Sequence, residues 1–155
     1  MERITAAISL LQSGDRDGAR SAFTDIWVEI AKDGDPFHRC TLAHYMADAQ
    51  DDHQAELMWD IRALAAADSL TDDRVKAHHA SLQLKAFYPS LHLNLAADYR
   101  KLGDQPNARA HIVLARQCVE TLPDDGYGNL IRGGIDRLND QLDAYPDSPD
   151  DSAHA

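Results

Sequence analysis

The feature that most constrains the fold is an internal repeat, because three segments share one order of small, turn and bulky residues. The segments begin at Ala6, Leu42 and Leu95. Each contains the same turn position, which is occupied by Gly14-Asp15, Gln50-Asp51 and Gly103-Asp104. An alanine follows each turn, and these alanines, Ala19, Ala55 and Ala108, lie 36 and 53 residues apart. A repeat of this length indicates a stack of similar structural units.

The residue types within each unit predict two short helices joined by a tight turn. Apolar residues recur at three- and four-residue spacing on both sides of the turn, as in amphipathic helices. Glycine permits the positive φ that such a turn can require, and the aspartate after it can cap the second helix. The recurrent alanine suits a close helix crossing. The chain is therefore predicted to be all-α.

This pattern resembles the tetratricopeptide repeat family. The third segment matches best, through Leu95, Ala96, Tyr99, Gly103, Ala108, Ile112 and Ala115. Arg39 and His92 stand where the family often has tryptophan, and the resemblance covers most of residues 3–121. It implies a right-handed superhelical stack of helix hairpins whose first helices line a concave face. It implies no particular partner, because such repeats serve many functions.

The repeat register predicts the helix boundaries. The expected hairpins are 2–13 with 16–32, 36–49 with 52–68, and 89–102 with 105–121. The larger spacing exceeds a repeat of about 34 residues by about 19. The surplus predicts an inserted helix over 74–87 that Pro89 ends or kinks. Residues 122–128 have the composition of a loop, and 129–143 is predicted as a C-terminal capping helix.

We expect one domain over 1–145 and a disordered acidic tail over 146–155. No apolar run reaches the roughly 20 residues of a membrane helix, and the N-terminus lacks the basic stretch of a signal peptide. These features predict a cytoplasmic protein in which Cys40 and Cys118 are reduced.

The formal net charge of −11 limits the classes of partner. An acidic surface repels phosphate, so we expect neither nucleic acid nor anionic membrane as a partner. A basic peptide would be attracted, although net charge acts first on solubility.

Motifs for chemistry are few. His44 and Asp48 share a helix face at four-residue spacing, which suits a metal or a proton relay, but a closed metal site needs three or four ligands. The adjacent His78 and His79 diverge on a helix. Phosphate-binding loops, nucleophile elbows and Cys- or His-based metal motifs are lacking. We therefore predict no metal, no cofactor and no catalytic residue.

The aromatic segment 87–94 suits either a ligand pocket or a core around a kink. Together with the concave face that the resemblance implies, it suggests a ligand groove with mixed polarity. Its candidate residues are Phe37, Cys40, His44, Asp48, Tyr88, His92, Leu93, Arg100 and Lys101. The basic residues do not stand where a carboxylate-clamp member of the family would have them.

These observations favour a non-enzymatic module that binds a peptide or protein partner in the concave groove. The first alternative is a small-molecule pocket, perhaps enzymatic, that the inserted helix 74–87 closes. Its walls would be His44, Tyr88, His92 and either His78 or His79. The second alternative is a homo-oligomeric scaffold, such as a homodimer that pairs through apolar residues of the first helix.

Overall fold

The computed structural model describes residues 1–71 and 78–144, without the side chains of 70–71 and 78–84. The described residues are all-α and contain no strand. Their helices are α1 (Glu2–Gln12), α2 (Arg16–Ile30), α3 (Pro36–Asp48), α4 (His53–Thr71), α5 (His78–Lys101), α6 (Gln105–Gln117), the 3₁₀ helix η1 (Val119–Thr121) and α7 (Gly126–Ala144). None of these helices is both long and apolar enough to cross a lipid bilayer.

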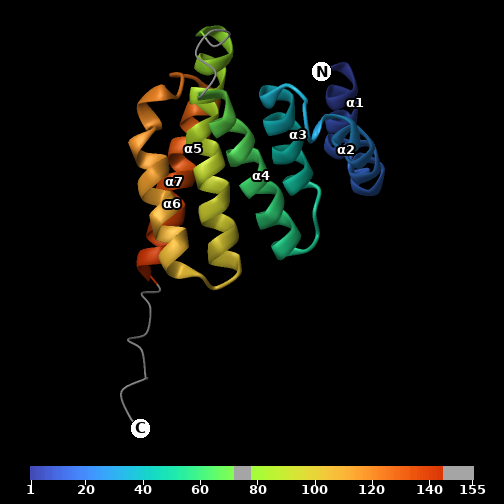
Figure 1. The fold of residues 1–155 in the computed structure, drawn as a ribbon. Coiled ribbons are helices and arrows are strands. Elements are labelled where there is room, and N and C mark those ends of the chain that lie inside the picture. The colour runs from blue at the N-terminus through green and yellow to red at the C-terminus, as the bar shows by residue number, and fades with distance from the viewer. Residues whose placement is uncertain (72–77, 145–155) are drawn as a thin grey trace.

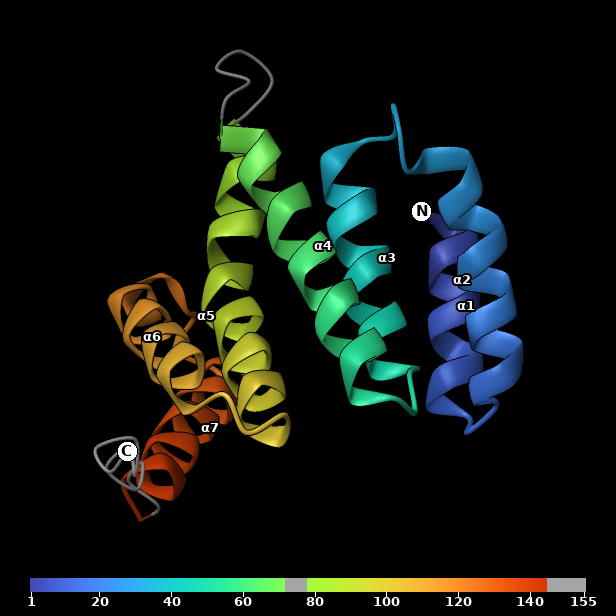
Figure 2. The same cartoon turned by 60° about the horizontal axis from the view of Figure 1, so that its bottom comes forward.

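The helices pack mainly with their neighbours in the chain. The pairs α1–α2, α3–α4 and α5–α6 form hairpins, α4 also packs along α5, and α7 covers α5 and α6. Figures 1 and 2 show the hairpins side by side, with α1 and α2 at one end and α6 and α7 at the other. The prediction of consecutive helix hairpins is confirmed at this level.

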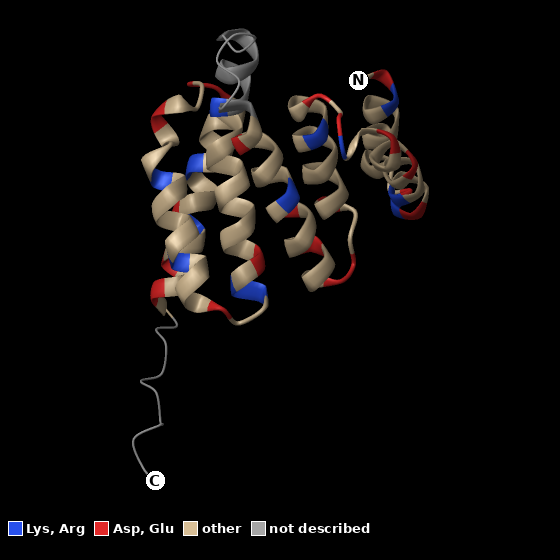
Figure 3. Cartoon of the chain, viewed as in Figure 1, with Lys and Arg blue, Asp and Glu red and all other residues tan. Residues whose placement is uncertain are grey.

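Aspartates fix where most of the helices begin. Five aspartate side chains each accept a hydrogen bond from the backbone N–H three residues further on: Asp15, Asp35, Asp52, Asp104 and Asp125. Each cap pairs an N–H that the helix itself leaves free, and is worth about 1 kcal/mol. In Figure 3 acidic residues accordingly mark several of the turns. Part of the acidic excess therefore serves helix capping.

The turn between the two helices of a hairpin takes two different forms in this chain. Gly14 and Gly103 have φ of +92° and +80°, as predicted for the first and third hairpins. Gln50 holds that place in the second hairpin, and no non-glycine residue among those described has a positive φ. Instead the Gln50 side chain donates a 2.9 Å hydrogen bond to the carbonyl of Met46 at the end of α3. A side chain thus replaces the left-handed turn.

The three hairpins use one equivalent position to hold the helix that follows. Arg20 donates to the carbonyl of Ala49 at the end of α3, and Arg109 donates to the carbonyl of Leu142 near the end of α7. At the same position of the second hairpin, Glu56 accepts a 2.6 Å hydrogen bond from Lys101 at the end of α5. The register read from the sequence therefore corresponds to equivalent contacts.

The buried apolar residues form two clusters. The first lies among helices α1, α2, α3 and α4 and also includes Leu91 of α5. Phe23, Leu42 and Leu91 in this cluster are fully buried. The second joins α5 to α7 and includes Ile112 and Ile135. Because α5 gives Leu91 to the first cluster and Ala96 to the second, this helix belongs to both.

Pro89 does not end a helix, so the predicted boundary between 74–87 and 89–102 is wrong. Residues 78–101 form one helix, α5, with Pro89 inside it. Proline has no N–H to pair with the carbonyl four residues earlier. That carbonyl belongs to Lys85, and the hydroxyl of Thr121 lies 2.8 Å from it and 2.7 Å from the carbonyl of Cys118, so its one hydrogen is shared between the two acceptors. A distant residue thus supplies the missing donor, and the surplus residues lengthen the α4–α5 pair beyond the rest of the stack (Figure 1).

Smaller corrections concern helix ends. The helix predicted over 105–121 ends at Gln117 and is followed by η1, while α7 begins at Gly126 rather than at 129. The start of the segment predicted over 74–87 and the tail predicted over 146–155 lie outside the described residues.

Candidate functional site

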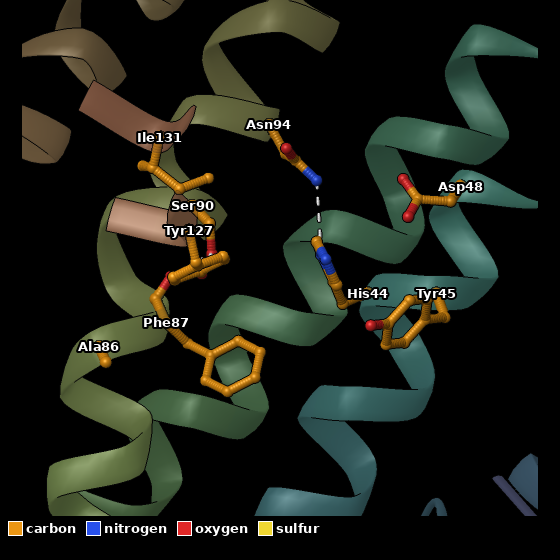
Figure 4. Close-up of a pocket in the computed structure, with 9 residues that line it drawn as sticks. All are labelled: His44, Tyr45, Asp48, Ala86, Phe87, Ser90, Asn94, Tyr127 and Ile131. Carbon is orange, nitrogen blue, oxygen red and sulfur yellow. Dashed lines mark hydrogen bonds between the residues drawn. The ribbon is translucent and has the colours of Figure 1, made fainter. Parts of the chain in front are cut away.

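A pocket of about 340 Å³ lies between α3, α5 and α7. Figure 4 shows side chains from the three helices converging on it. Its lining combines aromatic and polar groups: His44, Tyr45, Asp48, Ala86, Phe87, Ser90, Asn94, Tyr127 and Ile131. This volume is near the lower limit for ligand pockets.

The spacing of the lining residues explains why they meet. Residues four apart lie on one face of a helix. Such pairs or rows are His44 with Asp48 on α3, the series Ala86, Ser90 and Asn94 on α5, and Tyr127 with Ile131 on α7. Each helix therefore directs one side-chain row toward the same space.

Hydrogen bonds hold the α7 side of the pocket against α5. The hydroxyls of Tyr127 and Ser90 are 3.1 Å apart, and Ser90 donates to the carbonyl of Phe87 at 2.8 Å. The first turn of α7 lies close to the backbone of Pro123, and it can do so because residue 128 is glycine. A Cβ at Gly128 would lie only 1.9 Å from the carbonyl oxygen of Pro123. The position of Tyr127 therefore depends on its glycine neighbour.

His44 is a largely enclosed titratable group of the lining, with 17% of its side chain exposed. Its Nδ1 is 3.4 Å from Asn94 Nδ2, which donates when the imidazole is neutral, and 3.8 Å from Asp60 Oδ1 (Figure 4 draws the first contact). Burial alone lowers the pKa of His44, but the pairing with Asp60 and the charges of Asp48 and Asp60 outweigh it, so the pKa is raised. Protonation of His44 thus favours Asp60 over Asn94 as its partner.

Asp48 stands at the exposed edge of the pocket. Loss of part of its hydration raises its pKa, the charge of His44 opposes that shift, and repulsion from Asp60 and Glu56 adds to it. Repulsion of this kind indicates that negative charge accumulates on this side of the pocket.

Behind the pocket, α4 and α5 bury two carboxyl groups. Asp60 and Asp98 are each 1% exposed, and one oxygen of each has no conventional hydrogen-bond partner. Burial, followed by repulsion from Asp60 and Glu56, raises the pKa of Asp98 to about 8, although Lys101 opposes the shift. A protonated Asp98 can hydrogen-bond to Asp60, so this neutral form is the one that suits the packed interior.

Two of the nine sequence-predicted groove residues, His44 and Asp48, line the pocket. Phe37 supports it from behind, because its ring meets that of Phe87 edge to face with centroids 6.1 Å apart. Leu93 lies on another side of α5 and packs against the second apolar cluster.

The other five predicted residues lie elsewhere. Cys40 is buried, and desolvation together with Asp60 and Asp68 raises the pKa of its thiol to about 12. The hydroxyl of Tyr88 donates to Asp68 on α4, and the Nδ1 atoms of His92 and His111 are 3.0 Å apart. Arg100 is half-buried, and Lys101 is paired with Glu56 and Asp98.

The sequence reasoning missed most of the lining. Phe87, Ser90 and Asn94 fall in the segment noted for its aromatic and polar density, and the four-residue spacing of Ser90 and Asn94 could have selected that face. Tyr127 falls in the predicted loop 122–128, whereas α7 begins three residues before the predicted position.

In the part of the chain that the structure describes, no group of three or more His, Cys, Asp or Glu side chains is arranged to hold a metal ion. Comparison of the chain with protein-family models, with curated proteins and with solved structures finds no match.

Proposed function

We propose that the protein is a helical-repeat interaction module that binds a segment of a partner polypeptide along the face formed by α3, α5 and α7. The observation that supports this most directly is the convergence of side-chain rows from three helices on one pocket. In a right-handed stack of tetratricopeptide-type hairpins this would be the concave face. The equivalent contacts of Arg20, Glu56 and Arg109 support such a stack.

The pocket would act as the anchor of that interface. Binding energy at protein interfaces concentrates in a few side chains that fill desolvated pockets. A pocket of about 340 Å³ holds one such side chain, and the flanking helix faces would contact the adjoining residues of the segment. We therefore expect a dissociation constant on the order of micromolar, because one anchor and a short segment form a small interface.

The test uses the full chain and a defined probe, a phage-displayed library of random 12-residue peptides. Peptides selected on the wild-type protein are synthesised and their affinities are measured by isothermal titration calorimetry. Ala86→Trp fills the pocket from α5, and Val28→Trp makes a similar change at a site on α2 that is 79% exposed. We expect Ala86→Trp to weaken binding at least about tenfold, which is about 1.4 kcal/mol, and Val28→Trp to leave it unchanged. Selected peptides that bind Ala86→Trp as tightly as wild type would contradict the proposal.

The small-molecule alternative finds less support in the arrangement of the side chains. Tyr88 and His92 are absent from the pocket lining, and the side chains of His78 and His79 lie outside the described residues. The scaffold alternative is tested by sedimentation velocity at micromolar concentration, in which a concentration-independent monomer would argue against self-association.

A further inference from the structure

The aromatic walls and the charge of the pocket restrict the kind of side chain that it can accept. Tyr45, Phe87 and Tyr127 place three aromatic rings around the space, from three different helices. Aromatic faces attract cations, most strongly where water is partly excluded. Lysine and arginine also have long apolar stems, which suit a pocket with alanine and isoleucine in its walls.

The charged groups around the pocket favour the same sign of ligand. The lining described above includes Asp48 and contains no lysine or arginine. Figure 4 shows the Asp48 carboxylate directed from α3 toward the α5 side. Two groups near these carboxylates that can carry a positive charge already have partners: Lys101 lies 2.6 Å from Glu56 and 3.3 Å from Asp98, and His44 lies 3.8 Å from Asp60. The charge of His44 also acts on Asp48, but among the described residues Asp48 forms no ion pair within 4 Å, so an incoming cation can pair with it.

The field of the whole protein acts in the same direction. The formal net charge is −11, and Figure 3 shows the lysines and arginines scattered over several helices. A surface of this sign raises the local concentration of cationic segments and speeds their association.

We infer that the pocket accepts the cationic side chain of a lysine or arginine from the partner segment, with Asp48 pairing with its charge and the rings of Tyr45, Phe87 and Tyr127 packing around it. This inference rests on the proposed function for its physiological ligand, while the chemistry of the pocket can be tested separately. Arginine suits the site especially well, because its flat guanidinium group stacks on rings and pairs with carboxylates.

The first experiment tests the pocket alone. N-acetyl-arginine methylamide and N-acetyl-lysine methylamide are titrated into the full chain and followed by ¹H–¹⁵N correlation spectra. N-acetyl-norleucine methylamide serves as the uncharged control of similar length. We expect the two cations to shift the amide signals of His44, Asn94 and Tyr127, and norleucine to bind at least about threefold more weakly, the change expected for a partly exposed ion pair. Equal binding of norleucine would overturn the inference.

A second variant pair separates the role of Asp48 from net charge. Asp48→Asn should weaken the arginine probe about threefold to tenfold. Asp25→Asn removes the same charge from an exposed site on α2 and should have no effect beyond a small general one. If both variants reduce affinity equally, the attraction is nonspecific and the inference is wrong.

The two proposals fail in different ways. If library peptides bind in a pocket-dependent manner but are not enriched in lysine or arginine, the proposed peptide-binding function is supported and the inference of a cationic side chain in the pocket is wrong. If the arginine probe binds through Asp48 but no library peptide binds, the inference about the pocket is supported and the proposed peptide-binding function is wrong.

Discussion

The junctions at the two ends of the stack differ from the junction in its middle, although all three use the same repeat position. Arg20 and Arg109 each hold a backbone carbonyl of the following helix and pair with an aspartate beyond it, Asp51 and Asp143 respectively. At the middle junction the polarity is reversed, because Glu56 holds Lys101. The same spatial relationship is thus maintained with opposite charges.

The difference lies in what surrounds this position. The outer arginines satisfy carbonyls at helix ends, a task for which a cationic donor is suited. At the middle junction Lys101 also contacts Asp98, which faces Asp60 in the interior. One part of the α4–α5 contact therefore buries the two carboxyl groups of Asp60 and Asp98, and we call this part the acidic seam. The part around Leu91 is apolar. The raised pKa of Asp98 predicts that the stability of the middle junction depends on pH, and among the described residues the outer junctions contain no buried carboxyl pair.

The largest effect is expected from breaking the apolar half of the middle junction. Leu91 is fully buried on α5 within the first apolar cluster. Leu91→Ala should lower the free energy of unfolding by about 3 kcal/mol through lost burial and a cavity. Urea unfolding followed by circular dichroism measures this value. Leu130→Ala, at a site that is 62% exposed, should stay within about 0.5 kcal/mol of wild type, and a similar loss in both variants would remove the distinction.

The acidic half of the middle junction is tested by pH. Asp98, with a pKa of about 8 against an ordinary value of 3.8, keeps its proton in the folded protein and releases it when unfolded between these values. The folded state then binds more protons, so the free energy of unfolding falls as pH rises from about 4 to 8 and levels off above 8. Asp98→Asn cannot titrate, and its amide can donate to Asp60 as the protonated carboxyl does.

The expected difference is in slope rather than in stability at one pH. Between pH 5 and pH 9 Asp98→Asn should gain about 2 kcal/mol relative to wild type, a part of the value that the full shift allows. Asp25→Asn on the exposed surface of α2 supplies the baseline for removal of one carboxylate. Parallel stability curves for wild type and Asp98→Asn would show that the seam does not hold a proton.

An outer junction is weakened by removing its arginine. Arg109→Ala loses the hydrogen bonds to the carbonyl of Leu142 and to Asp143, and should cost about 1 kcal/mol. Amide hydrogen exchange should become faster in the last turns of α7, which this arginine holds. Arg116→Ala on the same helix loses only an exposed ion pair with Asp136 at 3.6 Å and should cost less than about 0.5 kcal/mol. Equal costs would mean that the carbonyl contact adds nothing.

The parts of this comparison differ in how far sequence alone could predict them. Gly14, Asp15, Gly103 and Asp104 act on their own neighbours, so the turns and caps follow from local residue types. The acidic seam could not be predicted in the same way, because Asp60 and Asp98 are ordinary helix residues until α4 and α5 pack. Likewise, His44 and Asp48 were found from their spacing on one helix, whereas the contribution of Tyr127 depends on where α7 begins and packs.

Pro89 is a second example of a feature that depends on packing and could not be predicted from local sequence. The smallest expected change in stability concerns α5, the helix that contributes to both apolar clusters. The carbonyl of Lys85 lacks an intrahelical donor at Pro89 and receives a hydrogen bond from Thr121 instead. Thr121→Val keeps the shape of the side chain and removes the donor shared by the carbonyls of Lys85 and Cys118, so it should cost between about 0.5 and 1 kcal/mol. In a Pro89→Ala background the new N–H can pair with Lys85, and the same substitution should then cost less. The double-mutant cycle, measured by urea unfolding, isolates this coupling. A coupling energy of zero would mean that α5 tolerates Pro89 without help from Thr121, and the continuity of α5 between the two halves would then need another explanation.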